Sequence, residues 1–90
     1  MPVTIQIPSP LRPHAGGASI AQVAAGTVRA ALSDLGKQHP ALVERMFDGE
    51  QPKRFLNLFV NDEDIRYLDG LDTAIKDGDE LSIIPAVAGG

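Results

Sequence analysis

Two stretches of alternating apolar and polar residues flank one stretch with helical spacing. The alternating stretches are residues 3–7 and residues 54–61. A period of two predicts strands with one buried face, because successive side chains of a strand point to opposite sides of the sheet. In the second stretch the predicted core residues are Leu56, Leu58 and Val60. This arrangement favours a sheet packed against a helix.

The helical stretch follows Gly26, and Thr27 is its predicted N-cap. Spacing of i, i+3, i+4 and i+7 places four apolar residues on one helix face: Val28, Ala31, Leu32 and Leu35. We expect this helix to end at residues 36–39. Pro40 then suits the first turn of a short second helix, whose apolar residues are Leu42, Val43, Met46 and Phe47.

The other segments carry shorter patterns. We expect loops at 12–17 and 48–53, a second strand at 18–24, a short edge strand at 65–68, a helical turn at 72–75, and a final strand at 80–85 after a tight turn at 76–79. The first two strands are close enough to form a hairpin, and the last can return to the middle of a mixed sheet. The order predicts an α+β fold of the β-grasp class, with one domain at residues 1–85.

The last five residues have neither turn chemistry nor apolar periodicity, and they are Ala86, Val87, Ala88, Gly89 and Gly90. We expect residues 86–90 to form a flexible tail. Fully extended, five residues reach ~17 Å, so the carboxylate of Gly90 could be inserted deep into another protein. The absence of a Cβ at Gly89 and Gly90 suits a narrow channel and leaves the terminal carbonyl open to attack.

Composition excludes several classes of function. The 90 residues include no cysteine, which rules out disulfides, thiolate metal sites and sulfur carried on a side chain. With 43% hydrophobic and 22% charged residues, and no apolar run of ~20 residues, a soluble cytoplasmic domain without membrane contact is expected. The net charge of −4 and the lack of a basic stripe argue against nucleic acid as a partner.

Two sets of polar residues are weak candidates for metal or acid–base chemistry. His14 and His39 have no second histidine or carboxylate at ligand spacing, and both are interpreted as loop or helix-end residues. The acidic run 62–64 is interpreted as a solvated turn. We therefore expect this chain to hold no metal and no cofactor of its own.

Three apolar residues form a candidate docking patch beside the tail. Strand alternation directs Phe55 and Phe59 away from the core, and Ile84 should share their side of the sheet. Exposed clusters of large apolar side chains mark interfaces. The alternative is that a loop or the short second helix covers them.

The predicted strand order and the ending Pro85-Ala86-Val87-Ala88-Gly89-Gly90 resemble the ubiquitin-like sulfur carriers. That family includes the molybdopterin synthase small subunit, the thiamine sulfur carrier and the carrier of a cysteine-synthesis pathway. The similarity is greatest to the actinobacterial cysteine-synthesis branch, and it lies in residues 3–14, residues 59–66 and the tail. A terminal Gly-Gly alone has little weight, because roughly one chain in two hundred would end so by chance.

The resemblance implies a carrier that is a substrate of enzymes, with no catalysis of its own. An ATP- and metal-dependent activating enzyme would adenylate Gly90, and a sulfur donor would displace AMP to leave a thiocarboxylate. In the cysteine branch, a pyridoxal-phosphate-dependent cysteine synthase would accept the sulfur. A metal-dependent peptidase would then release cysteine from Gly90.

Other functions use the same terminus. Sulfur transfer for molybdopterin differs only in the acceptor, and a protein modifier would join Gly90 to lysine amines. A pure interaction module would make the Gly-Gly ending incidental. The residues themselves do not choose among these functions.

Overall fold

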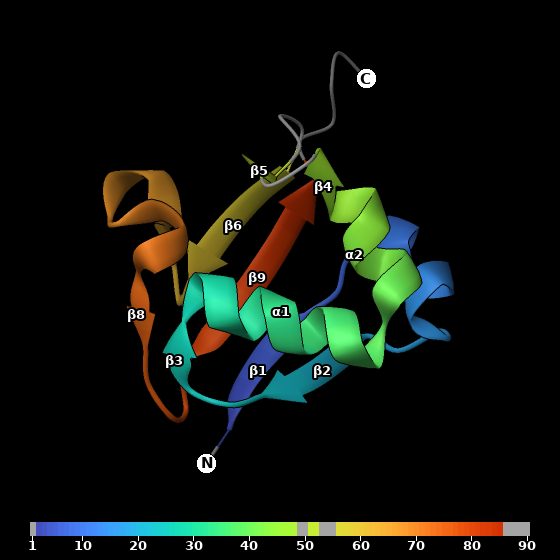
Figure 1. Cartoon of the computed structure of the whole chain (residues 1–90), viewed down its shortest axis with the longest axis horizontal. Coiled ribbons are helices and arrows are strands. Elements are labelled where there is room, and N and C mark those ends of the chain that lie inside the picture. Colours follow the sequence, from blue (N-terminus) through green and yellow to red (C-terminus); the bar gives the residue numbers. More distant parts are fainter. Residues whose placement is uncertain (1, 49–50, 53–55, 86–90) are drawn as a thin grey trace.

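The computed structural model describes residues 2–48, 51–52 and 56–85 (Figure 1). Its strands are β1 (Val3–Gln6), β2 (Ile20–Val23), β3 (Gly26–Thr27), β4 (Phe47–Asp48), β5 (Gln51–Pro52), β6 (Leu56–Val60), β7 (Glu63–Asp64), β8 (Ala74–Ile75) and β9 (Glu80–Pro85). The α-helices are α1 (Val28–Gln38) and α2 (Pro40–Met46), and the 3₁₀ helices are η1 (Ser9–Ala15), η2 (Ile65–Tyr67) and η3 (Gly70–Asp72).

The main sheet has the strand order β2-β1-β9-β6-β7. The hairpin partner β2 runs antiparallel to β1, whereas β9 lies parallel to β1 and antiparallel to β6. The last strand is therefore held between two neighbours in the middle of the sheet. This confirms the predicted order, in which the end of the chain returns to the centre of a mixed sheet.

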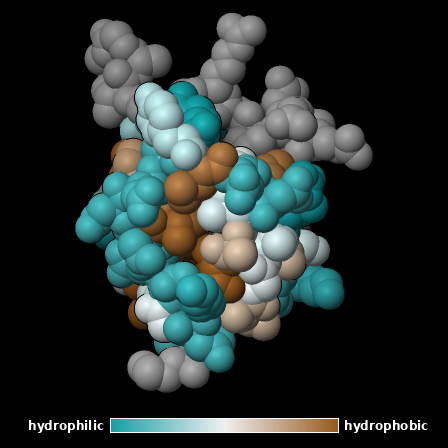
Figure 2. Space-filling view, turned by 90° about the vertical axis from the view of Figure 1, so that its left-hand side faces the viewer, coloured by the Kyte–Doolittle hydropathy of each residue, from teal (hydrophilic) through white to brown (hydrophobic). Residues whose placement is uncertain are grey.

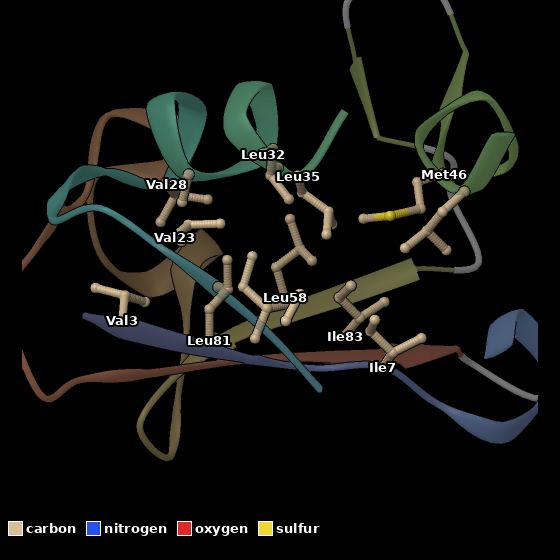
Figure 3. Close-up of a cluster of buried hydrophobic side chains, with 14 of the residues drawn as sticks. Val3, Ile7, Val23, Val28, Leu32, Leu35, Met46, Leu58, Leu81 and Ile83 are labelled. Carbon is tan, nitrogen blue, oxygen red and sulfur yellow. The ribbon is translucent and has the colours of Figure 1, made fainter. Parts of the chain in front are cut away.

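Both α-helices lie on one side of the sheet, as Figure 1 shows. The core between the layers joins side chains from every major element (Figure 3), including Val3 of β1, Leu35 of α1, Met46 of α2, Leu58 of β6 and Leu81 of β9. Because β-strand side chains alternate, the residues between these positions point to the opposite side of the sheet. That opposite side is called the outer face below.

The helix α1 begins where the sequence predicts. The side chain of Thr27 accepts a hydrogen bond from the backbone N–H of Ala30 at 3.1 Å, which caps the first turn. The helix runs through Gly36 and ends at Gln38, and Pro40 starts α2. The predicted helices are both confirmed, with Leu42 and Met46 fully buried.

The predicted edge strand at 65–68 is wrong. The edge strand β7 is Glu63–Asp64, and η2 follows it at once. The carboxylate of Asp64 accepts a hydrogen bond from the backbone N–H of Arg66 at 2.9 Å, which turns the chain into a 3₁₀ helix. Similarly, the predicted helical turn at 72–75 lies earlier, as η3, and residues 74–75 form β8 against β3.

Three other local predictions need correction. Residues 12–17, predicted as a loop, belong largely to η1, which buries Leu11 and Ala15 against the core. The second strand is shorter than residues 18–24 and spans Ile20–Val23. The predicted loop 48–53 contains β5 and the second residue of β4, and these two short strands pair antiparallel. In the part of the chain that the structure describes, no helix has the length and apolarity to cross a bilayer.

Candidate functional site

The last residues of β9, which lead to the tail, pair with β6, whereas the ladder between β9 and β1 ends at Ser82. Pro85 lies opposite Leu56 in the β6 ladder, and Ile84 lies opposite Asn57. At the other end of β9, the backbone N–H of Asn61 donates to the carbonyl of Glu80 at 2.7 Å, and Glu80 N–H donates to Asn61 Oδ1 at 3.1 Å. From Glu80 to Pro85, β9 is thus connected to Asn61 or paired with β6. The predicted site residues 86–90, Gly90 among them, lie outside the described residues.

The outer face carries two of the three predicted docking residues. Ile84 is 44% exposed and Phe59 is half-buried. Phe59 lies opposite Ser82, two residues from Ile84 along β9. Such diagonal neighbours are ~7–8 Å apart, close enough for an aromatic ring and an isoleucine to form one surface. The third residue, Phe55, lies outside the described residues.

Neither α-helix covers this pair. The buried residues of α1 and α2 pack into the core with Leu58 and Ile83, whose side chains point away from the outer face. The alternative in which the second helix covers Phe59 and Ile84 is therefore wrong. Docking on these two residues stays a prediction.

Ile20 is a further apolar residue of the outer face, and the sequence did not predict it. In the sheet ladders, Gln6 of β1 lies opposite both Ile20 of β2 and Ser82 of β9. Ile20 is therefore on the outer face, and it is 47% exposed. The alternation of residues 20–23 does indicate that Ile20 and Gln22 share a face. The alanines around these residues, however, leave the ends of the strand undefined in the sequence.

The β7 edge of the outer face holds an ion pair. Asp64 lies opposite Phe59, and its carboxylate accepts hydrogen bonds from Arg66 Nε at 3.1 Å and from Arg66 Nη2 at 2.6 Å. These side-chain bonds from Arg66 lower the pKa of Asp64, and the same interaction raises the pKa of Arg66. Both side chains therefore stay charged across the physiological range of pH.

The turn before β9 holds a second shifted carboxylate. Asp79 accepts a hydrogen bond from the backbone N–H of Lys76 at 2.9 Å, and Asn61 Nδ2 donates to it at 3.3 Å. The pKa of Asp79 is lowered, chiefly by the backbone bond from Lys76. This predicted tight turn is thus confirmed, and its hydrogen bonds position the start of β9.

The helical side of the molecule has a groove between α1 and α2. It measures about 730 Å³ and has an apolar floor that includes Leu32, Val43, Phe47 and Leu71. Figure 2, which views the side that carries β8, shows hydrophobic surface among hydrophilic side chains. In the segment that follows β7, Leu68 is 38% exposed and Tyr67 is more exposed still.

Within the described residues, no three histidine, aspartate or glutamate side chains gather in a way that could hold a metal ion. His14 lies in η1 and His39 stands between α1 and α2, as loop or helix-end residues would. The interpretation of residues 62–64 as a solvated turn fits Asp62 and Glu63, which are exposed, but it is wrong for Asp64, which is buried and paired with Arg66.

Comparison with known proteins gives consistent matches over the whole fold. The sulfur carrier protein CysO of Mycobacterium tuberculosis is 47% identical over 93 aligned residues, which cover 100% of both chains. CysO in the crystal structure of the Amycolatopsis orientalis BexX/CysO complex matches with a TM-score of 0.90 and 43% identity, covering 98% of this chain and 99% of that one.

A further similar structure is that of a protein named as a modifier. The small archaeal modifier protein 1 (SAMP1) of Methanosarcina acetivorans matches with a TM-score of 0.85 and 30% identity, covering 98% of this chain and 95% of that one. These likenesses confirm the ubiquitin-like β-grasp fold. The model of the ThiS family matches residues 5–90, nearly the entire chain. The chain is therefore a member of the ThiS family.

Proposed function

We propose that this chain is a sulfur carrier whose reacting group is the carboxylate of Gly90. The observation that carries the proposal is the full-length identity of 47% to a protein named as a sulfur carrier, together with a family match that runs through Gly90. The fold supports it, because β9 leads from the centre of the sheet directly to the tail. The domain holds the tail at its root, and partner enzymes act on its tip.

The chemistry needs activation from outside the chain. A terminal carboxylate with a pKa near ~3.5 is ionised and is a poor electrophile. A partner enzyme would join its oxygen to the α-phosphate of ATP and release pyrophosphate. A sulfide-level nucleophile then attacks the acyl carbon, the C–O bond to the phosphate breaks, and AMP leaves behind a thiocarboxylate. ATP and the metal that assists its reaction bind to the activating enzyme.

The destination of the sulfur follows from the same relatives. We place the chain in cysteine biosynthesis, because the CysO carriers match it over both full lengths. The thiocarboxylate would donate sulfur within a pyridoxal-phosphate-dependent synthase, and a metal-dependent peptidase would release the cysteine formed on Gly90. The complex of the Amycolatopsis relative with BexX supports binding of a protein partner.

The outer face provides the surface for such partners. Phe59 and Ile84 lie on β6 and β9, the two strands that meet at the root of the tail. A partner that covers this surface would receive the tail at a defined position. The residues Ala86, Val87, Ala88 and Gly89 would span the distance into its active site.

The decisive experiment changes only the terminus. We would compare wild-type protein with a Gly90 deletion and with a C-terminal alanine extension, measuring ATP-dependent AMP release and the mass of the product. Deletion withdraws the carboxylate by up to ~3.6 Å, and a misplacement of ~1 Å can cost ~100-fold in rate. Both variants should melt like the wild type and fail to form thiocarboxylate. Normal thiocarboxylate formation by either variant would falsify this mechanism.

A protein modifier is the second candidate, because a relative at 30% identity is named as a modifier. Intact mass of protein from cells separates the two functions. Exchange of one carboxyl oxygen for sulfur, or a cysteine adduct, supports the carrier. Conjugates of Gly90 with lysines of many proteins support the modifier, and sulfur found on molybdopterin would move the carrier to that pathway.

A further inference from the structure

The outer face has a positively charged group built into its β7 edge. Asp64 lies opposite Phe59 across the antiparallel ladder, so the two side chains share a face. Arg66 binds the carboxylate of Asp64 and therefore lies next to this surface. The patch of Phe59 and Ile84 is bordered on one side by a guanidinium.

The guanidinium is held in one orientation by a buried partner. Both oxygens of Asp64 accept from Arg66 Nε at 3.1 Å, and Oδ2 also accepts from Nη2 at 2.6 Å. The Asp64 side chain is only 8% exposed, whereas that of Arg66 is 68% exposed. The buried end of the pair thus fixes the direction of the exposed end.

The bond between Asp64 and the backbone N–H of Arg66 already shapes η2 without the guanidinium. An exposed arginine also adds little stability through an ion pair, typically ~0–1 kcal/mol. Of the five N–H groups of a guanidinium, the contacts with Asp64 use Nε–H and one on Nη2. The other three have no acceptor among the described residues.

Arg66 is a basic residue within an acidic stretch of the chain. Residues 62–69 include four acids, and Arg66 is the only basic residue among them. A partner carboxylate that approached the exposed Asp62 or Glu63 would meet like charge, whereas at Arg66 it would meet three oriented donors. Complementary charges of this kind determine how two partners align in a complex, whereas the size of the contact area does not.

We propose that Arg66 is a specificity-determining residue of the outer face: its remaining guanidinium N–H groups bind a carboxylate of the activating enzyme that docks on Phe59 and Ile84. A carboxylate is the matching ligand because its two oxygens accept from a planar guanidinium in parallel. Because Asp64 already restricts the side chain, binding costs little rotamer entropy. The inference rests on the proposed sulfur-carrier function and names how one partner is recognised.

The test uses the full chain and the activating enzyme, with kcat and KM for the carrier measured by AMP release. Arg66→Ala should raise KM about 10-fold or more and leave kcat unchanged, because Gly90 is untouched. The KM of Arg66→Lys should lie between those of Arg66→Ala and the wild type, because lysine keeps the positive charge but lacks the planar, forked donors of a guanidinium. Arg45→Ala is the matched control, because it removes an exposed arginine from α2 on the helical side. It should leave both constants unchanged.

A double variant separates recognition from folding. Arg66→Ala leaves Asp64 buried without its cation, whereas Asp64→Ala with Arg66→Ala removes the pair together. The double variant should show the same rise in KM, and thermal unfolding checks that each variant is folded at the assay temperature. Equal KM values for Arg66→Ala and Arg45→Ala, a loss confined to kcat, or a normal KM in the double variant would overturn the proposal. Failure of the wild type to be adenylated would overturn the proposed function as well, and it is seen without any variant.

Discussion

Thr27 and Ala30 are joined by a hydrogen bond of 3.1 Å in which the threonine hydroxyl accepts from the backbone N–H three residues later. This bond satisfies one of the free N–H groups in the first turn of α1. The same residue ends β3, where its backbone pairs with Ala74. One position therefore connects the start of the main helix to the small sheet beside it.

Thr27→Ala should lower the free energy of unfolding by ~1 kcal/mol, because it removes the cap and leaves the backbone pairing in place. For a chain of this size the melting temperature should fall by roughly 4–8 °C. Thr27→Ser keeps the hydroxyl and should restore most of the loss. A melting temperature equal to that of the wild type would show that the bond contributes nothing, and sulfur loading of folded protein should not change.

Gly36→Ala should stabilise the protein by ~0.5–1 kcal/mol. Gly36 lies inside α1, where alanine has the higher helix propensity, and an added Cβ would meet Val43 Cγ2 at 3.4 Å, the short limit of ordinary van der Waals contact. Urea unfolding of both proteins gives the difference. Gly36→Leu should do the opposite, since its larger side chain must displace Val43 of α2. Destabilisation by alanine would mean that the two helices cannot move apart by a few tenths of an ångström.

Ile84→Asp should abolish docking and leave the fold intact. Ile84 is exposed on the outer face, so the change should cost less than about 1 kcal/mol of stability, while a charge in the docking surface prevents its desolvation. Its neighbour is the control: Ile83 is 3% exposed and points into the core, so Ile83→Asp should prevent folding. We would measure affinity for the activating enzyme by calorimetry and folding by circular dichroism. Unaltered affinity of Ile84→Asp would remove this residue from the interface.

In Asp64→Asn the free energy of unfolding should decrease less on acidification than it does in the wild type. The pKa of Asp64 is lowered in the folded protein, chiefly by hydrogen bonds from the Arg66 side chain. A carboxyl group with a depressed folded pKa contributes stability that is fully present above its unfolded pKa, and this contribution is lost as the pH falls through the folded value. The loss should therefore occur below about pH 4.

The measurement is the free energy of unfolding from pH 2 to pH 7. Compared with wild type, Asp64→Asn should be less stable at pH 7 and should lose less on acidification. Asp62→Asn removes an exposed carboxylate from the same turn and serves as the control. Parallel curves for wild type and Asp64→Asn would contradict the role of this ion pair.

The sequence alone predicted those elements whose signal is local. The spacing of Val28, Ala31, Leu32 and Leu35, with Thr27 before them, predicts a capped helix because each interaction involves residues three or four apart. The alternation in 56–60 and the turn before Glu80 are local in the same sense. The order of these elements then restricts the fold to a mixed sheet that ends in a central strand.

Segments with competing signals were predicted less well. Residues 65–67 form a 3₁₀ helix because the Asp64 carboxylate binds the Arg66 backbone, and a side chain that satisfies backbone groups can replace a sheet ladder. The proline-containing segment 9–15 buries Leu11 and Ala15 without any regular period to indicate it. The first segment is decided by a hydrogen bond to one carboxylate and the second by burial of two separate residues, and hydrophobic periodicity encodes neither.

For the candidate site, the sequence supplied the reasons for proposing Gly90: no cysteine is present, and residues 89 and 90 are both glycine. Only the tertiary structure decided what surrounds the root of that tail. It brought Ile20 onto the same face as Ile84, and it placed Asp64, with its partner Arg66, opposite Phe59. The physical reason is that sheet register joins strands from opposite ends of the chain. Alternation within one strand indicates which of its residues share a face, but which strands become neighbours depends on the packing of the whole domain.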